Sequence, residues 1–199
     1  MCPYKQLIWD LGEEKSDENY LFTLLAINLS LIIFAKKPAS LVCFSEKTRQ
    51  MKSLWKKEKV LFSNSEIKYI ELKDRGDYIS ILFYQEDLLI DQLAQKEERE
   101  FLENLGYGND LALDEKFDKL KERFHQGNFD EIGIFLGYPT RDVKDFISKK
   151  KTCKCTGYWK VYNNQEESQK VFCYYDQIKR QTANLLSTIS SRDFLLEYT

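Results

Sequence analysis

Two short helical patterns meet at a Gly-Tyr-Pro turn in the sequence FDEIGIFLGYPTRDVKDFI, residues 129–147. Ile132 and Leu136 precede the turn, and Val143 and Phe146 follow it, at the three- and four-residue spacing of one helix face. Both helices can therefore close over a single apolar seam. This is a statement about architecture, and by itself it predicts no chemistry.

The segment CTGYWKVY, residues 155–162, follows this pair of helices. Its aromatic and β-branched residues are typical of a strand, and the two asparagines after it provide a turn. We expect the two segments to join helices to a sheet in the protein interior. Trp159 should then lie close to Ile132 and Val143.

The rest of the chain predicts a small sheet covered by helices. Residues 67–72 and 78–84 flank Gly76, which can take the positive φ of a tight reversal, so they predict a hairpin. Another strand is predicted at 41–44. A helix is predicted at 20–27 with its start at Ser16-Asp17, and one or two helices at 86–105. Further helices are predicted at 46–59, at 113–124 and from 166 onward, the last with a break at Ser190-Ser191. The pattern predicts an α+β fold: a small, mainly antiparallel sheet of about four strands, several helices and a long C-terminal helix. We expect a single domain over residues 1–199.

The charge balance and cysteine usage restrict the class of protein. Lys and Arg number 30 against 32 Asp and Glu, a net charge of -2 that offers no general attraction to nucleic acid. Five cysteines, an odd number, in a chain without a recognisable secretory leader indicate reduced thiols and a cytoplasmic location. The apolar run at residues 20–35 is shorter than the roughly 18 to 20 residues that cross a bilayer, so no membrane span is expected.

The blocks at residues 129–147 and 155–162 resemble the bacterial family catalogued as domain of unknown function 3793. The similarity extends more faintly through residues 37–41 and the hairpin ending at residues 82–84. The resemblance implies a single-domain cytosolic protein, chiefly of anaerobic Gram-positive bacteria, with no assigned activity.

The chain departs from the family pattern at two places. The pattern has a histidine just before Glu-Ile-Gly, where this sequence has Asp130, and a His-Cys pair where it has Asn28-Leu29. A Cys/His site operating in relatives is therefore not carried over at these positions.

Two thiol-based sites are conceivable. A nucleophilic pair would need a thiolate beside an imidazole, and the candidates for a thiol-dependent hydrolase or transferase are Cys155 and His125. Cys153, Cys155 and Cys173 could also supply three zinc ligands, but the spacing is a single Cys-x-Cys rather than two Cys-x-x-Cys knuckles. We expect these cysteines to pack between strand and helix, with no metal or other cofactor.

Residues 131–146 also fit a helix-turn-helix pattern, in which Lys144, Lys149, Lys150 and Lys151 would contact phosphate. Asp142 and Asp145 on the second helix would repel the same backbone, so the sequence disfavours nucleic acid as a partner.

The aromatic residues beside the turn carry the leading functional hypothesis. Tyr138, Tyr158, Trp159 and Tyr162, with Lys160, could line a site for an unknown protein or small molecule, because binding sites combine rings with a few polar groups. The same rings could equally form core, each phenol bonding to backbone. We predict a non-catalytic or catalytically degenerate binding domain.

Overall fold

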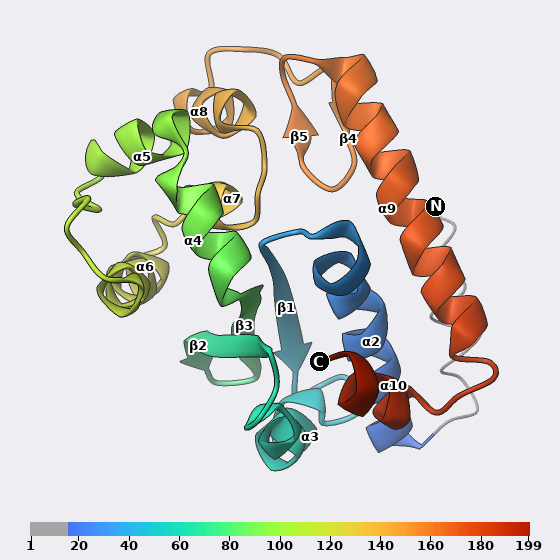
Figure 1. Ribbon diagram of the computed structural model, residues 1–199. Helices are drawn as coiled ribbons and strands as arrows, with labels where there is room; N and C mark the ends of the chain where they lie inside the picture. Colours follow the sequence, from blue (N-terminus) through green and yellow to red (C-terminus); the bar gives the residue numbers. More distant parts are fainter. Residues whose placement is uncertain (1–15) are drawn as a thin grey trace. The chain divides into compact units, whose positions relative to one another are not determined.

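The computed structural model describes residues 16–199 (Figure 1). The chain forms two units. One runs through Gln85 and resumes from Tyr174 to Thr199, and the other is Glu86–Cys173. The predictions about Cys2 and about a leader fall outside the described residues.

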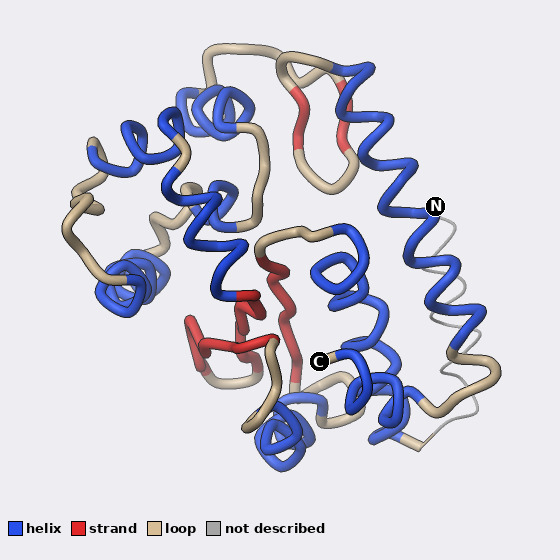
Figure 2. The backbone as a smooth tube through the Cα atoms, in the orientation of Figure 1, coloured by secondary structure: helices blue, strands red, loops and turns tan. Residues whose placement is uncertain are grey.

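The first unit contains a three-stranded antiparallel sheet in the order β1-β3-β2, shown in red in Figure 2. Its strands are β1 (Ala39–Ser45), β2 (Ile67–Arg75) and β3 (Tyr78–Gln85). Gly76 joins β2 to β3 with a φ of 49°, as the predicted hairpin requires. The register is interrupted by an irregularity between Glu71 and Lys73.

Helices cover this sheet. They are α2 (Asp17–Ala35), α3 (Met51–Glu58), the 3-10 turn η1 (Lys59–Phe62) and α10 (Ser191–Tyr198). The side chain of Ser16 caps α2 by accepting a hydrogen bond from the Asn19 N–H. The α2 helix contacts β1, β3, α3 and α10, and the hydroxyls of Thr23 and Ser191 lie 2.8 Å apart.

The helix predicted at residues 46–59 begins only at Met51, because Arg49 and Gln50 have positive φ angles of 48° and 51°. These left-handed residues turn the chain out of β1 and prevent an earlier helical start.

The α2 helix is 19 residues long with a mean hydropathy of 1.6 in its most apolar window, and by length and composition alone it could cross a membrane. In the structure 56% of that window is buried, as in the core helix of a soluble protein. This one weak candidate among the described residues is consistent with a soluble protein.

The second unit is mainly helical. It contains α4 (Glu86–Ala94), α5 (Lys96–Glu103), α6 (Leu113–Gln126), α7 (Ile132–Phe135), α8 (Thr140–Ser148), β4 (Cys155–Thr156) and β5 (Lys160–Val161). The α8 helix contacts α5, α7 and β5, and so connects the helices to the hairpin. The long helix α9 (Gln165–Leu185) contributes residues through Cys173 to this unit and the remainder to the first.

The strand predicted through Tyr158 and Trp159 is shorter than expected. Only Lys160 and Val161 form β5, and Tyr158 and Trp159 belong to the reversal that connects it to β4. The Gly157 N–H closes this reversal by donating to the Trp159 carbonyl at 3.0 Å. The described strands therefore form two small antiparallel sheets rather than one of about four strands.

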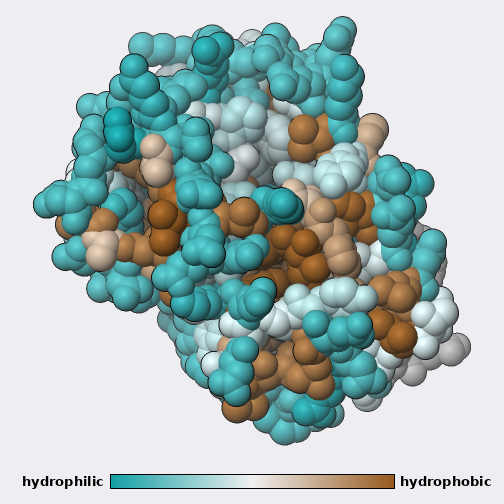
Figure 3. All heavy atoms as spheres, in the orientation of Figure 1, coloured by the Kyte–Doolittle hydropathy of each residue, from teal (hydrophilic) through white to brown (hydrophobic). Residues whose placement is uncertain are grey.

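The predicted α+β class and the long C-terminal helix are confirmed. The predicted break is present as well, since α10 begins after Ser190, whose side chain accepts from the Asp193 N–H. The single domain over residues 1–199 stays a prediction. On the face drawn in Figure 3, hydrophilic side chains cover much of the surface and hydrophobic ones form smaller patches.

Candidate functional site

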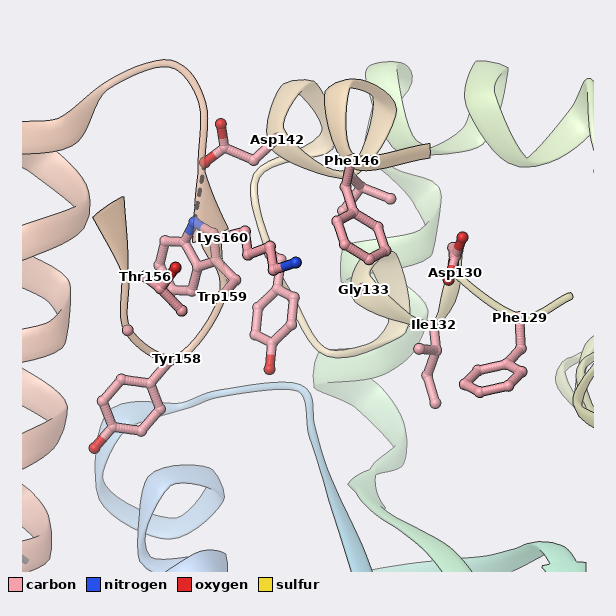
Figure 4. A pocket seen from close by; sticks show the side chains of 13 residues that line it. Phe129, Asp130, Ile132, Gly133, Asp142, Phe146, Thr156, Tyr158, Trp159 and Lys160 are labelled. Carbon is pink, nitrogen blue, oxygen red and sulfur yellow. Dashed lines mark hydrogen bonds between the residues drawn. The ribbon is translucent and has the colours of Figure 1, made fainter. Parts of the chain in front are cut away.

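A cavity of about 400 Å³ lies in the second unit, where α7, α8 and the β4–β5 hairpin converge. Figure 4 shows its walls. The lining residues are Phe129, Asp130, Ile132, Gly133, Tyr138, Asp142, Val143, Phe146, Thr156, Gly157, Tyr158, Trp159 and Lys160. Most are aromatic or apolar, so the cavity suits the body of an organic molecule better than a hydrated ion.

Gly133 permits the close approach of α7 to α8 that forms one wall. A Cβ at this position would lie 2.7 Å from Val143 Cγ2 and 3.3 Å from Tyr138 Cδ2. The turn between the helices is fixed by Gly137, with a φ of 71°, and by a 2.8 Å hydrogen bond from the Tyr138 N–H to the Gly133 carbonyl. The Gly-Tyr-Pro turn thereby directs the Tyr138 ring to the cavity.

Asp142 connects α8 to the hairpin. Its Oδ2 accepts from the Trp159 indole N–H at 2.9 Å, drawn as a dashed line in Figure 4. Its Oδ1 accepts from the backbone N–H groups of Tyr162 and Asn163, both at 3.0 Å, and from the Asn163 side chain at 2.9 Å. The carboxylate is buried, and these four donors compensate its charge.

The rings beside the cavity contact one another. Tyr138 and Trp159 have centroids 5.2 Å apart, and Phe172 of α9 meets Trp159 edge-on at 4.5 Å. Phe172 also packs over Gly157, where a Cβ would lie only 2.3 Å from its ring. The aromatic groups hold the hairpin loop in place, so the cavity wall is preformed.

Lys160 supplies the cation of the cavity. Its Nζ lies 5.2 Å from the centroid of the Phe146 ring, and Figure 4 shows the side chain between Trp159 and Phe146. Within the described residues its ammonium forms no ion pair. Asp130, the other charged lining residue besides Asp142, is exposed and lies beside Phe129 and Ile132.

The structure brings together four of the five residues predicted to form a binding site. Tyr138, Tyr158, Trp159 and Lys160 all line the cavity. Tyr162 does not: it is buried after β5, and its backbone N–H bonds to Asp142. The expected proximity of Trp159 to Ile132 and Val143 is present, because all three line the same cavity. Ligand binding by these residues stays a prediction.

The proposed catalytic pair is not assembled in the structure. His125 is exposed in the last turn of α6, whereas Cys155 is half-buried in β4. No hydrogen bond between described residues joins the thiol to the imidazole. Neither residue lines the cavity.

The three cysteines considered as metal ligands do not form a ligand cluster within residues 16–199. The Cys153 thiol donates to the Cys155 carbonyl at 3.1 Å, and Cys173 is exposed on α9. Cys153 and Cys155 are both half-buried, whereas the exposed Cys173 does not meet the expectation that all three cysteines pack between strand and helix.

The structure of residues 131–146 differs from that of a DNA-binding helix-turn-helix. Its first helix, α7, is one turn of four residues, and Asp142 of the second is buried. The Lys144 ammonium lies 3.4 Å from Glu97, and that of Lys151 lies 2.7 Å from Asp145. These two cations already have carboxylate partners, which disfavours their use as phosphate contacts.

Sequence reasoning missed a buried polar group in the second unit, formed by Glu131, Arg123 and Tyr107. Glu131 is completely buried and accepts hydrogen bonds from Arg123 Nε and, at 3.2 Å, from a terminal guanidinium nitrogen of the same residue. The Tyr107 hydroxyl donates to it at 2.8 Å. Burial raises the pKa of Tyr107 above its ordinary value, and the hydrogen bond to Glu131 raises the pKa of Arg123.

No short pattern could have indicated this group, because its three members come from separate segments.

A family model described as "Protein of unknown function (DUF3793)" matches residues 25–196. The chain belongs to this family. The DUF3793 match covers the cavity and both units, and it confirms the resemblance expected from residues 129–147 and 155–162. No curated protein and no solved structure gives a significant match.

Proposed function

We propose that this DUF3793 protein binds an organic ligand in the cavity of its second unit and catalyses no reaction there. The observation that carries the proposal is the convergence of three sequence segments, residues 129–133, 138–146 and 156–160, on one aromatic-walled space. Its volume of about 400 Å³ is in the range of small-molecule sites.

The chemistry of the walls supports binding rather than catalysis. Acid-base catalysis needs a carboxylate that is available to a substrate proton. Asp142 instead holds four donors of its own unit, so its role is to position Trp159 and the hairpin. A preformed wall of this kind lowers the entropic cost of binding.

We also infer a cytosolic location in a bacterium. This inference rests on the family resemblance and on the odd number of cysteines.

The test uses the full chain and N-phenyl-1-naphthylamine, a neutral aromatic probe. Indole N–H signals are followed by NMR during titration, and Trp159→Phe assigns the Trp159 signal. We expect a saturable shift of the Trp159 signal and none of Trp55, which is fully buried in the first unit. A titration in which Trp159 does not move would reject the proposal.

A matched pair of variants locates the binding. Thr156 lines the cavity, and Thr152 is similarly exposed but lies outside it. Thr156→Phe should fill the cavity and lower the affinity for the probe by about tenfold or more. Thr152→Phe should leave this affinity within about twofold of that of the unaltered chain. Equal effects of both substitutions would show that the probe binds elsewhere.

A further inference from the structure

Among the described residues that line the cavity, Lys160 is the one cation, and it indicates the charge of the ligand. Lys144 and Lys151 of the same unit have carboxylate partners, and Lys154 donates to the Asn163 carbonyl. Lys160 has only the face of Phe146 among the described residues. A cation–π contact uses the charge of an ammonium but leaves N–H donors available to an acceptor.

The buried carboxylate that lines the cavity with Lys160, that of Asp142, cannot serve as this acceptor without losing its own bonds. Both oxygens of Asp142 are taken up by the Trp159 indole, two backbone N–H groups and the Asn163 side chain. The negative charge of Asp142 is therefore compensated by these four donors and not by Lys160. The cavity therefore retains a positive end at Lys160.

The far wall has the opposite character. Phe129 and Ile132 line it beside the exposed Asp130. A carboxylate at this end would repel an anionic group placed next to it, whereas the two apolar side chains accept a hydrocarbon or a ring. The two ends differ in charge, so an asymmetric ligand has one preferred orientation.

We propose that the ligand is an organic monoanion with an aromatic or apolar body, whose carboxylate, sulfonate or similar group contacts Lys160 Nζ while its ring lies between Tyr138, Trp159 and Phe146. This proposal rests on the proposed function and specifies the chemical class that the same cavity selects. The anion replaces water at the ammonium, and burial of the ring beside it strengthens the charge-assisted hydrogen bond.

The test compares two probes that differ in one group. The probe 8-anilinonaphthalene-1-sulfonate carries a sulfonate on the skeleton of neutral N-phenyl-1-naphthylamine. Both are titrated into the full chain, and binding is read from probe fluorescence and from the Trp159 indole signal. Lys160→Met should lower the affinity for the sulfonate probe by about tenfold but the affinity for the neutral probe by less than about threefold.

Two further variants serve as controls. Lys150→Met removes the same charge from an exposed residue outside the cavity and should leave both affinities within about twofold. Lys160→Arg keeps the cation and should retain most of the sulfonate affinity. Far-UV circular dichroism of each variant shows whether it folds. For the unaltered chain, a higher salt concentration should lower the affinity for the sulfonate probe but not for the neutral probe.

The outcomes separate the two proposals. Equal losses for both probes in Lys160→Met, with the neutral probe still moving Trp159, would overturn the anion preference and leave the binding function intact. Absence of any Trp159 shift with either probe would overturn both. Salt-independent binding of the sulfonate probe would also contradict the anion preference.

Discussion

Each unit places a tryptophan among other rings, and each indole donates its N–H to a carboxylate: Trp55 to Glu71 at 3.0 Å and Trp159 to Asp142 at 2.9 Å. Trp55 is surrounded by other rings. Four aromatic side chains have centroids between 4.9 and 6.0 Å from it, namely Phe44, Phe62, Tyr69 and Phe83, and the indole is completely buried. Around Trp159, Tyr138 and Phe172 occupy two sides and a cavity occupies another.

The difference arises from the backbone that carries the rings. Phe44, Tyr69 and Phe83 extend from neighbouring strands of one sheet, where side chains on the same face pack together. Trp159 instead lies in the loop between two strands of two residues each, and its ring meets side chains from separate helices. The cations differ too, because Lys59 bonds to Glu71 at 2.9 Å whereas Lys160 lacks such a partner among the described residues. Aromatic composition alone therefore does not distinguish core from site.

The largest expected effect tests this contrast directly. Trp55→Ala should lower the free energy of unfolding by about 4 kcal/mol, because it removes the centre of a closed cluster. Trp159→Ala should cost about 2 kcal/mol, since part of its surroundings is already empty. Chemical denaturation of the full chain measures both, and the reverse order would mean that the cavity is not an open space in solution.

The next effect concerns the two carboxylates of α8. Asp142→Asn places an N–H group among donors that need an acceptor, and should cost about 3 kcal/mol. Asp145→Asn is the control, because Asp145 is less buried and bonds to Lys151 and Asn163 at the surface. It should cost less than about 1 kcal/mol. Similar losses for the two variants in urea unfolding would refute the structural role given to Asp142.

A smaller effect is expected at the helix contact. Gly133→Ala should cost about 2 kcal/mol, because its Cβ meets Val143 at 2.7 Å. Adding Val143→Ala should recover part of that loss. Gly76→Ala provides a comparison in the first unit: no atom lies within 4 Å of the added Cβ, and only the positive φ costs about 1 kcal/mol. Strict additivity of Gly133→Ala and Val143→Ala would contradict the close approach.

The smallest effect is a pH dependence. Burial raises the pKa of Tyr107, so the folded protein keeps this phenol neutral at a pH where the unfolded chain ionises it. Its contribution to stability is complete below the unfolded pKa of about 10 and is lost as the pH rises above that value. Tyr107→Phe should cost about 1 kcal/mol at pH 7 and should flatten the loss of stability above pH 10. Tyr69→Phe, from the cluster around Trp55, serves as the control. If Tyr107→Phe leaves the loss of stability above about pH 10 unchanged, burial of a neutral Tyr107 phenol is not its cause.

Local patterns predicted those parts of the fold that local forces determine. The Gly76 hairpin, the Ser16 cap and the break before α10 depend on glycine conformation or on a neighbouring side chain, and these are visible within a few residues. The start of α3 could not be read in this way, because two left-handed residues, Arg49 and Gln50, carry no glycine signal. Tyr158 and Trp159 have strand propensity but lie in a reversal that Phe172 and Asp142 hold from elsewhere in the unit.

The candidate site was predictable in part, because some of its residues stand out by type within a short stretch of sequence. Tyr138, Trp159 and Lys160 were singled out by type and by their nearness to a Gly-Tyr-Pro turn, and they line one cavity. The walls contributed by Phe129 and Thr156, and the bonds of Asp142, depend on how hairpin and helices pack together. Such long-range packing leaves no periodic signal in a single sequence.

The contact between α2 and α10 has a consequence for synthesis of the chain. The hydroxyls of Thr23 and Ser191, which share a hydrogen bond in this interface, are 168 positions apart, and the whole second unit is translated between them. During synthesis, the apolar face of α2 that packs against α10 therefore stays exposed until α10 has been translated. The first unit can therefore complete its packing only after the contiguous residues of the second unit have been synthesised.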